Sequence, residues 1–374
     1  MVGRVSRRRN PPRDAKTADY ATANPPYGPD SRADLEFRAL LALSARLGRD
    51  PLRTQAAGGN TSLKRDGVMW IKASGTWLAE AETRDIMVPV ALAPLREALA
   101  AGDPRAEKAT AFVLDALNPS GLRPSVETSV HAVIAHDVVV HIHCVATTAL
   151  AVRTDAEEVI AERLRDVPGV DWMLVPYVKP GVPLSRAIAA RLRPSTNVII
   201  LGSHGLIVTA GTVAEADTLV RRVCGALEVD PRAIAPADVA GLAHLAAGSP
   251  YRLPADPLAH GVALDETSLA VARLGSLYPD HVVFLGRGIT VLADGATPAD
   301  AAAVAAPPLV LVAPGKGVLL HAAALRGADE LARGLTEVTA RIPAAAPVQC
   351  LTRAQEDELI HWDAEVYRLS LATR

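Results

Sequence analysis

The sequence has few cysteines, little net charge and no long hydrophobic run, and each of these shortages excludes a class of protein. Its three cysteines lie far apart in 374 residues and form neither a disulfide framework nor a Cys-x-x-Cys metal clip, which is typical of a reducing cytoplasm. The formal charge of −2 creates no overall field that would attract nucleic acid or a membrane surface. No apolar run approaches the roughly 18 to 20 residues needed to span a bilayer. We therefore expect a cytoplasmic protein with no nucleic-acid or membrane partner.

Composition divides the chain into segments. Residues 1–31 are rich in proline and charge and contain almost nothing to bury, so we expect a disordered tail, with an arm that binds polyanions as the alternative. Its arginine cluster has no apolar segment behind it, so it is not a secretory signal. With 49% hydrophobic residues, the chain is long enough for two domains. We expect one domain over 32–229, a linker rich in proline, alanine and glycine over 230–260, and a small C-terminal α/β region over 261–374.

Hydrophobic periodicity and capping residues predict a mixture of helices and strands, and hence an α/β fold. Apolar residues at helical spacing, followed by a glycine, predict a first helix that begins near Leu35. Further helices are expected over 95–100, 106–117, 126–135, 147–152, 156–165, 184–192, 212–227, 328–342 and 352–371. Short apolar runs predict strands near Lys64 and Lys72 and over 86–90, 138–143, 172–175, 197–201, 206–209, 282–285, 289–292, 309–312 and 317–320.

The stretch Val138–His143, which reads VVVHIH, is the centre of the chemical argument. Side chains alternate between the two faces of a strand, so His141 and His143 should point the same way. Neutral imidazoles suit zinc and similar divalent ions, although a His-x-His pair on a strand is as often surface decoration or local hydrogen bonding. A third histidine, His204 in LGSHGLIVTA, and an upstream carboxylate, Glu127, favour a metal site. Three histidines with an open coordination position and a nearby glutamate are the arrangement of a catalytic metal.

Two turns that contain glycine are candidates for binding an anion. In AAGGNTSLK, two glycines allow the backbone to approach a ligand closely, and Asn60 and Thr61 follow with short polar groups. In MWIKASGTWL, a strand that carries Lys72 is followed by a turn with Ser74 and Gly75. Small donors, glycines and lysines suit a phosphate or another anion. Taken singly, each segment is better explained as an ordinary hairpin turn.

The segment PSVETSVH connects these groups to a predicted helix. Ser125 is a natural N-cap, which places Glu127 in the first helical turn and His131 one turn later on the same face. A glutamate in the first turn often only complements the helix dipole. His131 is expected to be a hydrogen-bonded structural histidine rather than a ligand, and the same holds for His136, which precedes the VVVHIH strand.

Five motifs in this order, GGNTS, WIKASG, PSVETSVH, VVVHIH and SHGL, resemble the class II aldolase/adducin family over about residues 35–227. Their wording is most similar to the aldolase half of bifunctional rhamnulose-1-phosphate aldolase/lactaldehyde dehydrogenase proteins, and YPDHVVFLG, LVLVAPGKGVLL and HWDAEVYRL resemble segments that follow that half. The resemblance implies a class II aldolase-like α/β/α sandwich with a mainly antiparallel central sheet. It also implies zinc, or another divalent transition metal, and commonly a cyclic homotetramer with the site near a subunit interface.

The resemblance also assigns roles to individual residues. It implies that the metal ligands are His141, His143 and His204, and that the acid/base group is Glu127. The positions that hold the substrate phosphate in that family correspond here to Asn60, Ser74, Gly75 and Ser125. The family's Ser-Ser-Glu signature reads Ser-Val-Glu in this chain, which removes one hydroxyl from the anion pocket. Its proton-donating tyrosine has no clear match, and Tyr177 is the candidate.

The activity that the resemblance implies is that of a metal-dependent aldehyde-lyase, which cleaves a ketose, expected to be phosphorylated, by a retro-aldol reaction. The metal would stabilise the enediolate left by carbon–carbon cleavage, and Glu127 would move a proton to and from that carbon, aided by a pKa that apolar surroundings raise. Two alternatives stay open: relatives of this fold epimerise or dehydrate sugar phosphates with the same histidines, and the adducin branch assembles without catalysis. The expected partners are a sugar or sugar-phosphate substrate and other copies of this chain.

Overall fold

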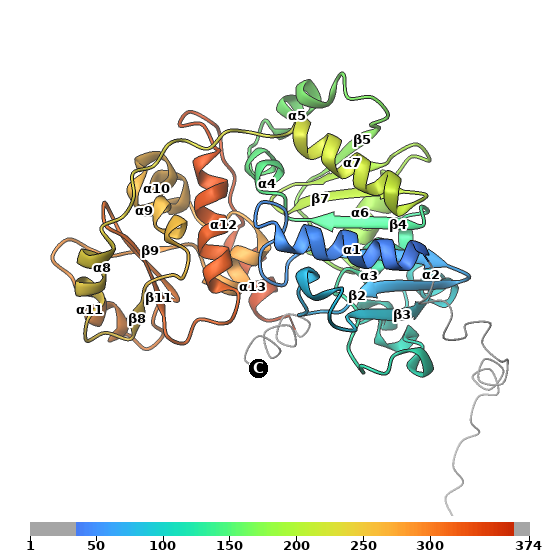
Figure 1. The fold of residues 1–374 in the computed structure, drawn as a ribbon, viewed down its shortest axis with the longest axis horizontal. Coiled ribbons are helices and arrows are strands. Elements are labelled where there is room, and N and C mark those ends of the chain that lie inside the picture. The colour runs from blue at the N-terminus through green and yellow to red at the C-terminus, as the bar shows by residue number, and fades with distance from the viewer. Residues whose placement is uncertain (1–34, 363–374) are drawn as a thin grey trace, which may run out of the picture.

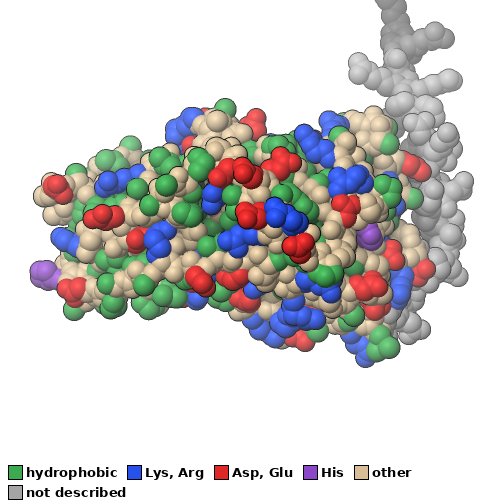
Figure 2. Space-filling model, turned by 90° about the horizontal axis from the view of Figure 1, so that it is seen from above, with side chains coloured by type: hydrophobic (Ala, Val, Ile, Leu, Met, Phe, Trp, Pro, Cys, Tyr) green, Lys and Arg blue, Asp and Glu red, His purple; other side chains and the backbone are tan. Residues whose placement is uncertain are grey.

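The computed structural model describes residues 35–362, so the predicted tail over 1–31 and the end of the predicted last helix lie outside the described residues. Within that range the chain forms two β-sheets with helices around them (Figure 1). None of the helices in 35–362 combines the length and the apolar character needed to cross a bilayer. On the face drawn in Figure 2, acidic and basic side chains are interspersed, in keeping with the small net charge.

The larger sheet has seven strands in the order β3-β2-β1-β4-β7-β6-β5. Neighbouring strands run antiparallel, except for β5 and β6, which are parallel. The strands are β1 (Asn60–Arg65), β2 (Val68–Lys72), β3 (Met87–Ala91), β4 (Val138–Ile142), β5 (Trp172–Val175), β6 (Val198–Leu201) and β7 (Gly205–Ala210). The prediction of a mainly antiparallel central sheet is therefore confirmed.

Helices cover both faces of this sheet, which confirms the predicted α/β/α sandwich. One face packs against α1 (Leu35–Arg49) and α7 (Val213–Ala226), whose apolar side chains share a buried cluster with alternate residues of β4. The opposite face packs against α3 (Thr128–Val133) and α6 (Val182–Ala189), which share a second cluster with the other residues of the strands. The remaining helices of this part are α2 (Leu92–Ala101), α4 (Val145–Ala151) and α5 (Ala156–Leu164).

A smaller α/β region follows in the C-terminal part of the chain, as predicted. Its sheet has four strands in the order β8-β11-β10-β9. These strands are β8 (Tyr251–Arg252), β9 (Thr290–Val291), β10 (Val310–Ala313) and β11 (Gly317–His321). Its helices are α8 (Val239–Ala246), α9 (Gly261–Leu264), α10 (Glu266–Arg273), α11 (Pro298–Ala302), α12 (Ala328–Ala340) and α13 (Arg353–Ile360). Helix α12 lies between the two sheets in Figure 1 and shares a buried apolar cluster with α4, so the two parts pack directly against each other.

Helix α8 and strand β8 fall within the segment 230–260, which the sequence predicted to be a linker. Strand β8 pairs with β11, so part of that segment belongs to the smaller sheet. The exact position of the domain boundary stays a prediction.

Two predicted elements take another form. The expected helix over 106–117 is a series of separate 3-10 turns, because Val113 is extended and pairs with Val90 on the edge strand β3. The expected strand over 282–285 is a π-helical turn, His281–Leu285, whose residues are all buried. A short apolar run does not distinguish a buried strand from a buried helical turn, which explains the second error.

Helix α3 begins later than predicted, although the Ser125 hydroxyl accepts a hydrogen bond of 3.2 Å from the Glu127 backbone N–H, the bond expected of a capping serine. Pro124 pairs with Ala73 just beyond β2, and the Ser125 backbone N–H donates to the Lys72 carbonyl, 3.1 Å away. These contacts keep the start of the segment 124–127 alongside the sheet, so the helix starts at Thr128 and Glu127 occupies the N-cap position.

Gly48 should be essential for the packing of α1. A Cβ at this position would lie 2.0 Å from the backbone nitrogen of Ala79 in the 3-10 turn Leu78–Glu80. Gly48→Ala should therefore lower the free energy of unfolding by about 1–3 kcal/mol or more, as overpacking does. The matched control Gly225→Ala, in α7, places a Cβ with nothing within 4 Å and should stabilise the protein by up to about 1 kcal/mol. Urea unfolding measures both changes, and an unaltered midpoint for Gly48→Ala would contradict the first.

Lys64 should make stability depend on pH. Its ammonium is buried and donates to the His136 carbonyl, 2.6 Å away. Burial, aided by the nearby charge of Arg96, lowers its pKa to about 7, against about 10.4 in an unfolded chain. Between about pH 7 and about pH 10.4 the unfolded chain therefore binds more protons than the folded one, and the free energy of unfolding should rise with pH. Urea midpoints across this window should show the rise in the wild type and its loss in Lys64→Met.

Candidate active site

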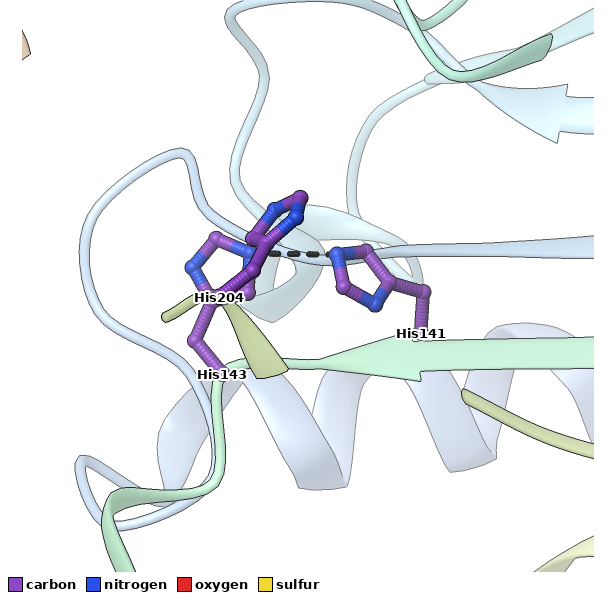
Figure 3. A group of neighbouring side chains, drawn as sticks. All are labelled: His141, His143 and His204. Atoms are coloured by element: carbon purple, nitrogen blue, oxygen red, sulfur yellow. Dashed lines mark hydrogen bonds between the residues drawn. The ribbon is translucent and has the colours of Figure 1, made fainter. Parts of the chain in front are cut away.

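Strand β4 and the residue after it present His141 and His143 on the face of the sheet that α3 and α6 cover. The alternate residues Val140 and Ile142 point to the opposite face and pack into the cluster with α1 and α7. The Nε2 atoms of the two histidines lie 3.1 Å apart. Figure 3 shows the two rings turned toward each other at the end of β4. The predicted common orientation of this pair is therefore confirmed.

His204 reaches the same point from the turn between β6 and β7. Ser203 adopts a left-handed conformation with a φ of 50°, and Gly205 then brings β7 alongside β4. A Cβ on Gly205 would lie 2.6 Å from the Ile142 carbonyl oxygen, so this close approach of two backbones requires glycine. The centroid of the His204 ring is 4.9 Å from that of His141 and 5.1 Å from that of His143. Three imidazoles from two distant segments of the sequence thus converge (Figure 3).

The three imidazoles fit a divalent transition metal. Their candidate ligand nitrogens all lie within 4.8 Å of one another, and all three side chains are buried. Tetrahedral coordination at about 2.0–2.1 Å would place two nitrogen ligands about 3.3 Å apart, which is close to the separation of the Nε2 atoms of His141 and His143. Burial lowers the pKa of His141, and it lowers the pKa of His204 to about 3. These two rings are therefore neutral at pH 7, which is the form that binds a cation.

The Glu127 carboxylate faces this cluster. Its Oε2 lies 3.3 Å from His141 Nε2, and its Oε1 lies 3.7 Å from His204 Nε2. The Asn60 side-chain amide donates a hydrogen bond of 2.8 Å to Oε2. Oε1 has no hydrogen-bond partner among residues 35–362. Glu127 therefore has one anchored oxygen and one that is available for proton transfer.

The pKa of Glu127 moves in the direction opposite to our prediction. Burial raises it, as expected, but the attraction of His141, His204 and His143 and the hydrogen bond from Asn60 outweigh burial and lower the pKa to about 2. This attraction requires positive charge at the imidazoles, which protons supply at low pH and a bound cation would supply at neutral pH. The prediction of a raised pKa was wrong because it considered only the apolar surroundings.

Most of the predicted anion-binding residues line the same pocket. The pocket beside the imidazoles is lined by Asn60, Lys72, Ser74, Gly75, Ser125 and Glu127, among others. The Ser74 backbone N–H donates to the Arg123 carbonyl, 3.0 Å away, which holds the Ser74–Gly75 turn against the segment that carries Ser125. The Ser74 hydroxyl has no hydrogen-bond partner among the described residues, although it is buried. It is therefore a candidate donor to a ligand.

Lys72 lines this pocket too, but its ammonium contacts protein oxygens. Nζ donates to the carbonyl of Ala57 at 2.9 Å and to that of Thr76 at 2.7 Å. It thereby connects the glycine turn before β1 to the Ser-Gly-Thr turn after β2. Lys72 positions both turns and places a positive charge beside the pocket.

Thr61 and Tyr177 are not among the residues that line the pocket. Thr61 points to the other face of β1, where its hydroxyl lies 2.7 Å from the Ser44 hydroxyl of α1, because side chains alternate along a strand. The prediction that Thr61 binds substrate did not take this alternation into account. Tyr177 packs against an apolar cluster that contains Leu359, and burial raises the pKa of its hydroxyl. Within its own chain Tyr177 therefore contributes to apolar packing, and its role as a proton donor stays a prediction.

The other two histidines of this part have structural contacts, as predicted. His131 Nδ1 lies 2.7 Å from the Ser62 hydroxyl, and His136 Nδ1 lies 3.0 Å from the Thr209 hydroxyl. Both pairs join a strand of the larger sheet to the chain around α3.

Asp280 was not predicted from the sequence, and Gly58 was expected only as one of two glycines that let the backbone approach a ligand. Asp280 belongs to the C-terminal region, yet it lines the pocket, and its Oδ2 lies 2.9 Å from His143 Nδ1. Gly58 leaves room for this contact, since a Cβ there would lie 2.7 Å from each of these two atoms. No spacing pattern in the sequence links Asp280 to His143. The only indication that Asp280 could belong to the site was the presence of an aspartate in the segment YPDH.

The pocket beside the imidazoles is small and adjoins a larger cavity. Its volume is about 30 Å³, which is room for an ion and a few small atoms. Ser74 and Val126 also line a second cavity of about 730 Å³, whose wall carries Lys108, Arg123 and Lys179 together with two glutamates. There is thus space for the reacting end of a small molecule at the imidazoles and for its remainder in the second cavity.

Comparison with known proteins places residues 38–228 in a family described as Class II Aldolase and Adducin N-terminal domain. A Bacillus subtilis (strain 168) protein named uncharacterized oxidoreductase YuxG is 30% identical over 191 residues, which are 47% of this chain and 26% of that protein. The match thus spans about a quarter of the relative's length. The N-terminal class II aldolase domain of a conserved protein from Thermoplasma acidophilum is 24% identical with a TM-score of 0.45, covering 52% of this chain and 92% of that one. The L-fuculose-1-phosphate aldolase from Thermus thermophilus is 21% identical with a TM-score of 0.33, covering 50% of this chain and 92% of that one.

Both TM-scores are below 0.5, so the assignment depends on the sequence match, which covers about half of this chain. The matched residues include the larger sheet, its three converging histidines and Glu127. The chain belongs to the class II aldolase and adducin N-terminal domain family.

Proposed function

We propose that this protein is a metal-dependent aldehyde-lyase that cleaves a phosphorylated ketose by a retro-aldol reaction. The observation that carries the proposal is the Glu127 carboxylate, which lies 3.3 Å from His141 Nε2 and 3.7 Å from His204 Nε2. Burying a carboxylate beside three imidazoles lowers the free energy of unfolding. This arrangement is useful to an enzyme, whereas a protein that only forms assemblies does not need it. Family membership supports an enzyme of the class II aldolase type.

In the proposed reaction His141, His143 and His204 hold the cation, which when bound supplies Lewis-acid stabilisation of the negative charge that develops as the carbon–carbon bond breaks. A proton must then reach the carbon that has lost its partner. The substrate hydroxyl that becomes the aldehyde releases one proton, and the carbon takes one up. Glu127, which its low pKa keeps ionised at neutral pH, accepts a proton at Oε1, the oxygen without a described hydrogen bond, and passes it to this carbon. Asn60 keeps the carboxylate in place through its 2.8 Å hydrogen bond to Oε2. Fixed placement of this kind lowers the entropic part of the barrier.

The surroundings of the pocket support a substrate that carries an anion. The Ser74 hydroxyl is buried without a described partner, Ser125 lines the same pocket, and Lys72 provides positive charge nearby. Arg123 and Lys179 add basic groups in the adjoining cavity, whose wall carries three basic and two acidic side chains. These groups suit a phosphate at the end of the substrate that is distant from the metal.

A screen of ketose 1-phosphates with analysis of the products tests the reaction itself. Two carbon fragments from one substrate would support the lyase. One isomer would instead indicate an epimerase, and one dehydrated product a dehydratase, and either result would replace the lyase proposal. No turnover by zinc-loaded protein on any ketose phosphate would favour an assembly role.

Alanine at His141, His143 or His204 should remove stoichiometric metal, because each change takes one of three nitrogen ligands from the site. The proposed ion is zinc, and metal analysis of the purified protein and its variants measures both its identity and its amount. His136→Ala is the control, since His136 contacts Thr209 and lies outside the pocket. Full metal content in all three ligand variants would contradict the assignment.

Glu127→Gln should retain the metal and lower turnover by about 10² or more, the usual scale for a general acid/base group. Glutamine preserves the shape of the side chain and removes its ability to carry the proton. Glu158→Gln, an exposed change on α5, should leave turnover unaltered. Steady-state kinetics with measured metal content tests this, and unchanged turnover in Glu127→Gln excludes Glu127 from the mechanism.

We further propose, from family membership, that the protein forms a homotetramer and, from its cysteines, that it works in the cytoplasm. All three cysteines are free thiols, which suits a reducing compartment. Light scattering on the eluting protein measures the oligomeric state, and a monomer would contradict the first part of this proposal.

A further inference from the structure

Asp280 connects the C-terminal region to the metal pocket. It lies outside residues 38–228, which match the family, and it directly precedes the π-helical turn His281–Leu285. Its side chain is buried, with 2% of the residue exposed, and its Oδ2 lies 2.9 Å from His143 Nδ1. The contact is at ion-pair distance, and its geometry is not that of an aligned hydrogen bond. His143 turns its other ring nitrogen, Nε2, toward His141. The carboxylate therefore lies behind the imidazole, at the nitrogen that faces away from the proposed metal.

The outer nitrogens of the three imidazoles have different surroundings. His141 Nδ1 lies 3.2 Å from the carbonyl oxygen of Leu206, a neutral acceptor on β7. His204 Nδ1 is buried and has no hydrogen-bond partner among the described residues. Within residues 35–362, His143 is the one of the three whose outer nitrogen has a carboxylate within ion-pair distance.

We infer that Asp280 is a positioning residue of the metal site: the negative charge of its carboxylate, 2.9 Å from His143 Nδ1, favours the proton on that nitrogen and so leaves the Nε2 lone pair free for the cation. Histidines that bind metals commonly give their second N–H to a carboxylate, which fixes the tautomer, orients the ring and makes the ligand more basic. The inference rests on the metal-binding part of the proposed function and is independent of the retro-aldol step.

The packing around Asp280 fits a fixed position. Val283 and Phe284, in the turn that follows it, share a buried apolar cluster with Ala56 and Ala57 from the glycine turn before β1. Gly58, in that same turn, leaves space at the contact between Asp280 and His143. One apolar cluster therefore holds both the segment that carries the carboxylate and the turn that borders the metal pocket. The C-terminal region is on this basis a part of the metal site.

The test is a titration of the metal-free full-length protein with Zn²⁺ in competition with a chromophoric chelator. Asp280→Asn and Asp280→Ala should each weaken Zn²⁺ binding by about 10- to 100-fold, the range found for partners of metal-binding histidines. The control Asp256→Asn removes a carboxylate of the same region that pairs with Arg333, 2.7 Å away, and should leave the affinity unchanged. Wild-type affinity in both Asp280 variants overturns the inference.

Two further measurements separate positioning from folding. The thermal midpoint of the metal-free Asp280→Asn protein should stay close to that of the wild type, while its Zn²⁺ affinity falls. NMR of the imidazole nitrogens in the metal-free wild type, assigned with His143→Gln, should show the His143 proton on Nδ1, and a proton on Nε2 overturns the inference even if no Asp280 variant folds. If alanine at the three histidines leaves Zn²⁺ affinity unchanged, the metal centre itself is wrong. If only the Asp280 variants bind like the wild type, this inference alone is wrong.

Discussion

The register between three antiparallel strands is the constraint on which the site depends. Asn60 pairs with His141 across β1 and β4, and His141 pairs with Ile207 across β4 and β7. Because side chains alternate along a strand, a shift of β4 by one residue would move its imidazoles to the face covered by α1 and α7. The same shift would withdraw Val138 and Val140 from the apolar cluster on that face, where both are completely buried. Packing of the valines therefore fixes the position of the histidines.

The features that could be predicted correctly from the sequence are those that depend on short segments. The segment VVVHIH predicts a strand, and side chains alternate along a strand. The common direction of His141 and His143 could therefore be predicted from this segment alone. The capping box that begins at Thr212 likewise marked the start of α7 within one residue. His204 could also be identified locally, because it lies between two short apolar runs. That it approaches His141 and His143 in the fold was implied only by the resemblance to a family.

The features that the sequence did not reveal depend on contacts between distant segments. Val113 leaves a helical pattern to pair with the edge strand β3, and the start of α3 is delayed by pairing of Pro124 with Ala73. Asp280 adjoins a segment whose conformation was itself mispredicted as a strand, and nothing near it in sequence indicates His143. The pKa of Glu127 depends on the sum of three neighbours and an amide. Local composition gave only the burial contribution to that sum.

Lys72 has a consequence for how the anion pocket moves. Its buried ammonium donates to the carbonyls of Ala57 and Thr76, and so ties the turn before β1 to the turn after β2. Opening either turn would take an acceptor from a desolvated cation, which is unfavourable by more than an ordinary hydrogen bond. The two turns should therefore fluctuate together, as a single cooperative unit of local unfolding. A substrate would then encounter the anion pocket either fully formed or fully open, and partly formed conformations would be rarely populated.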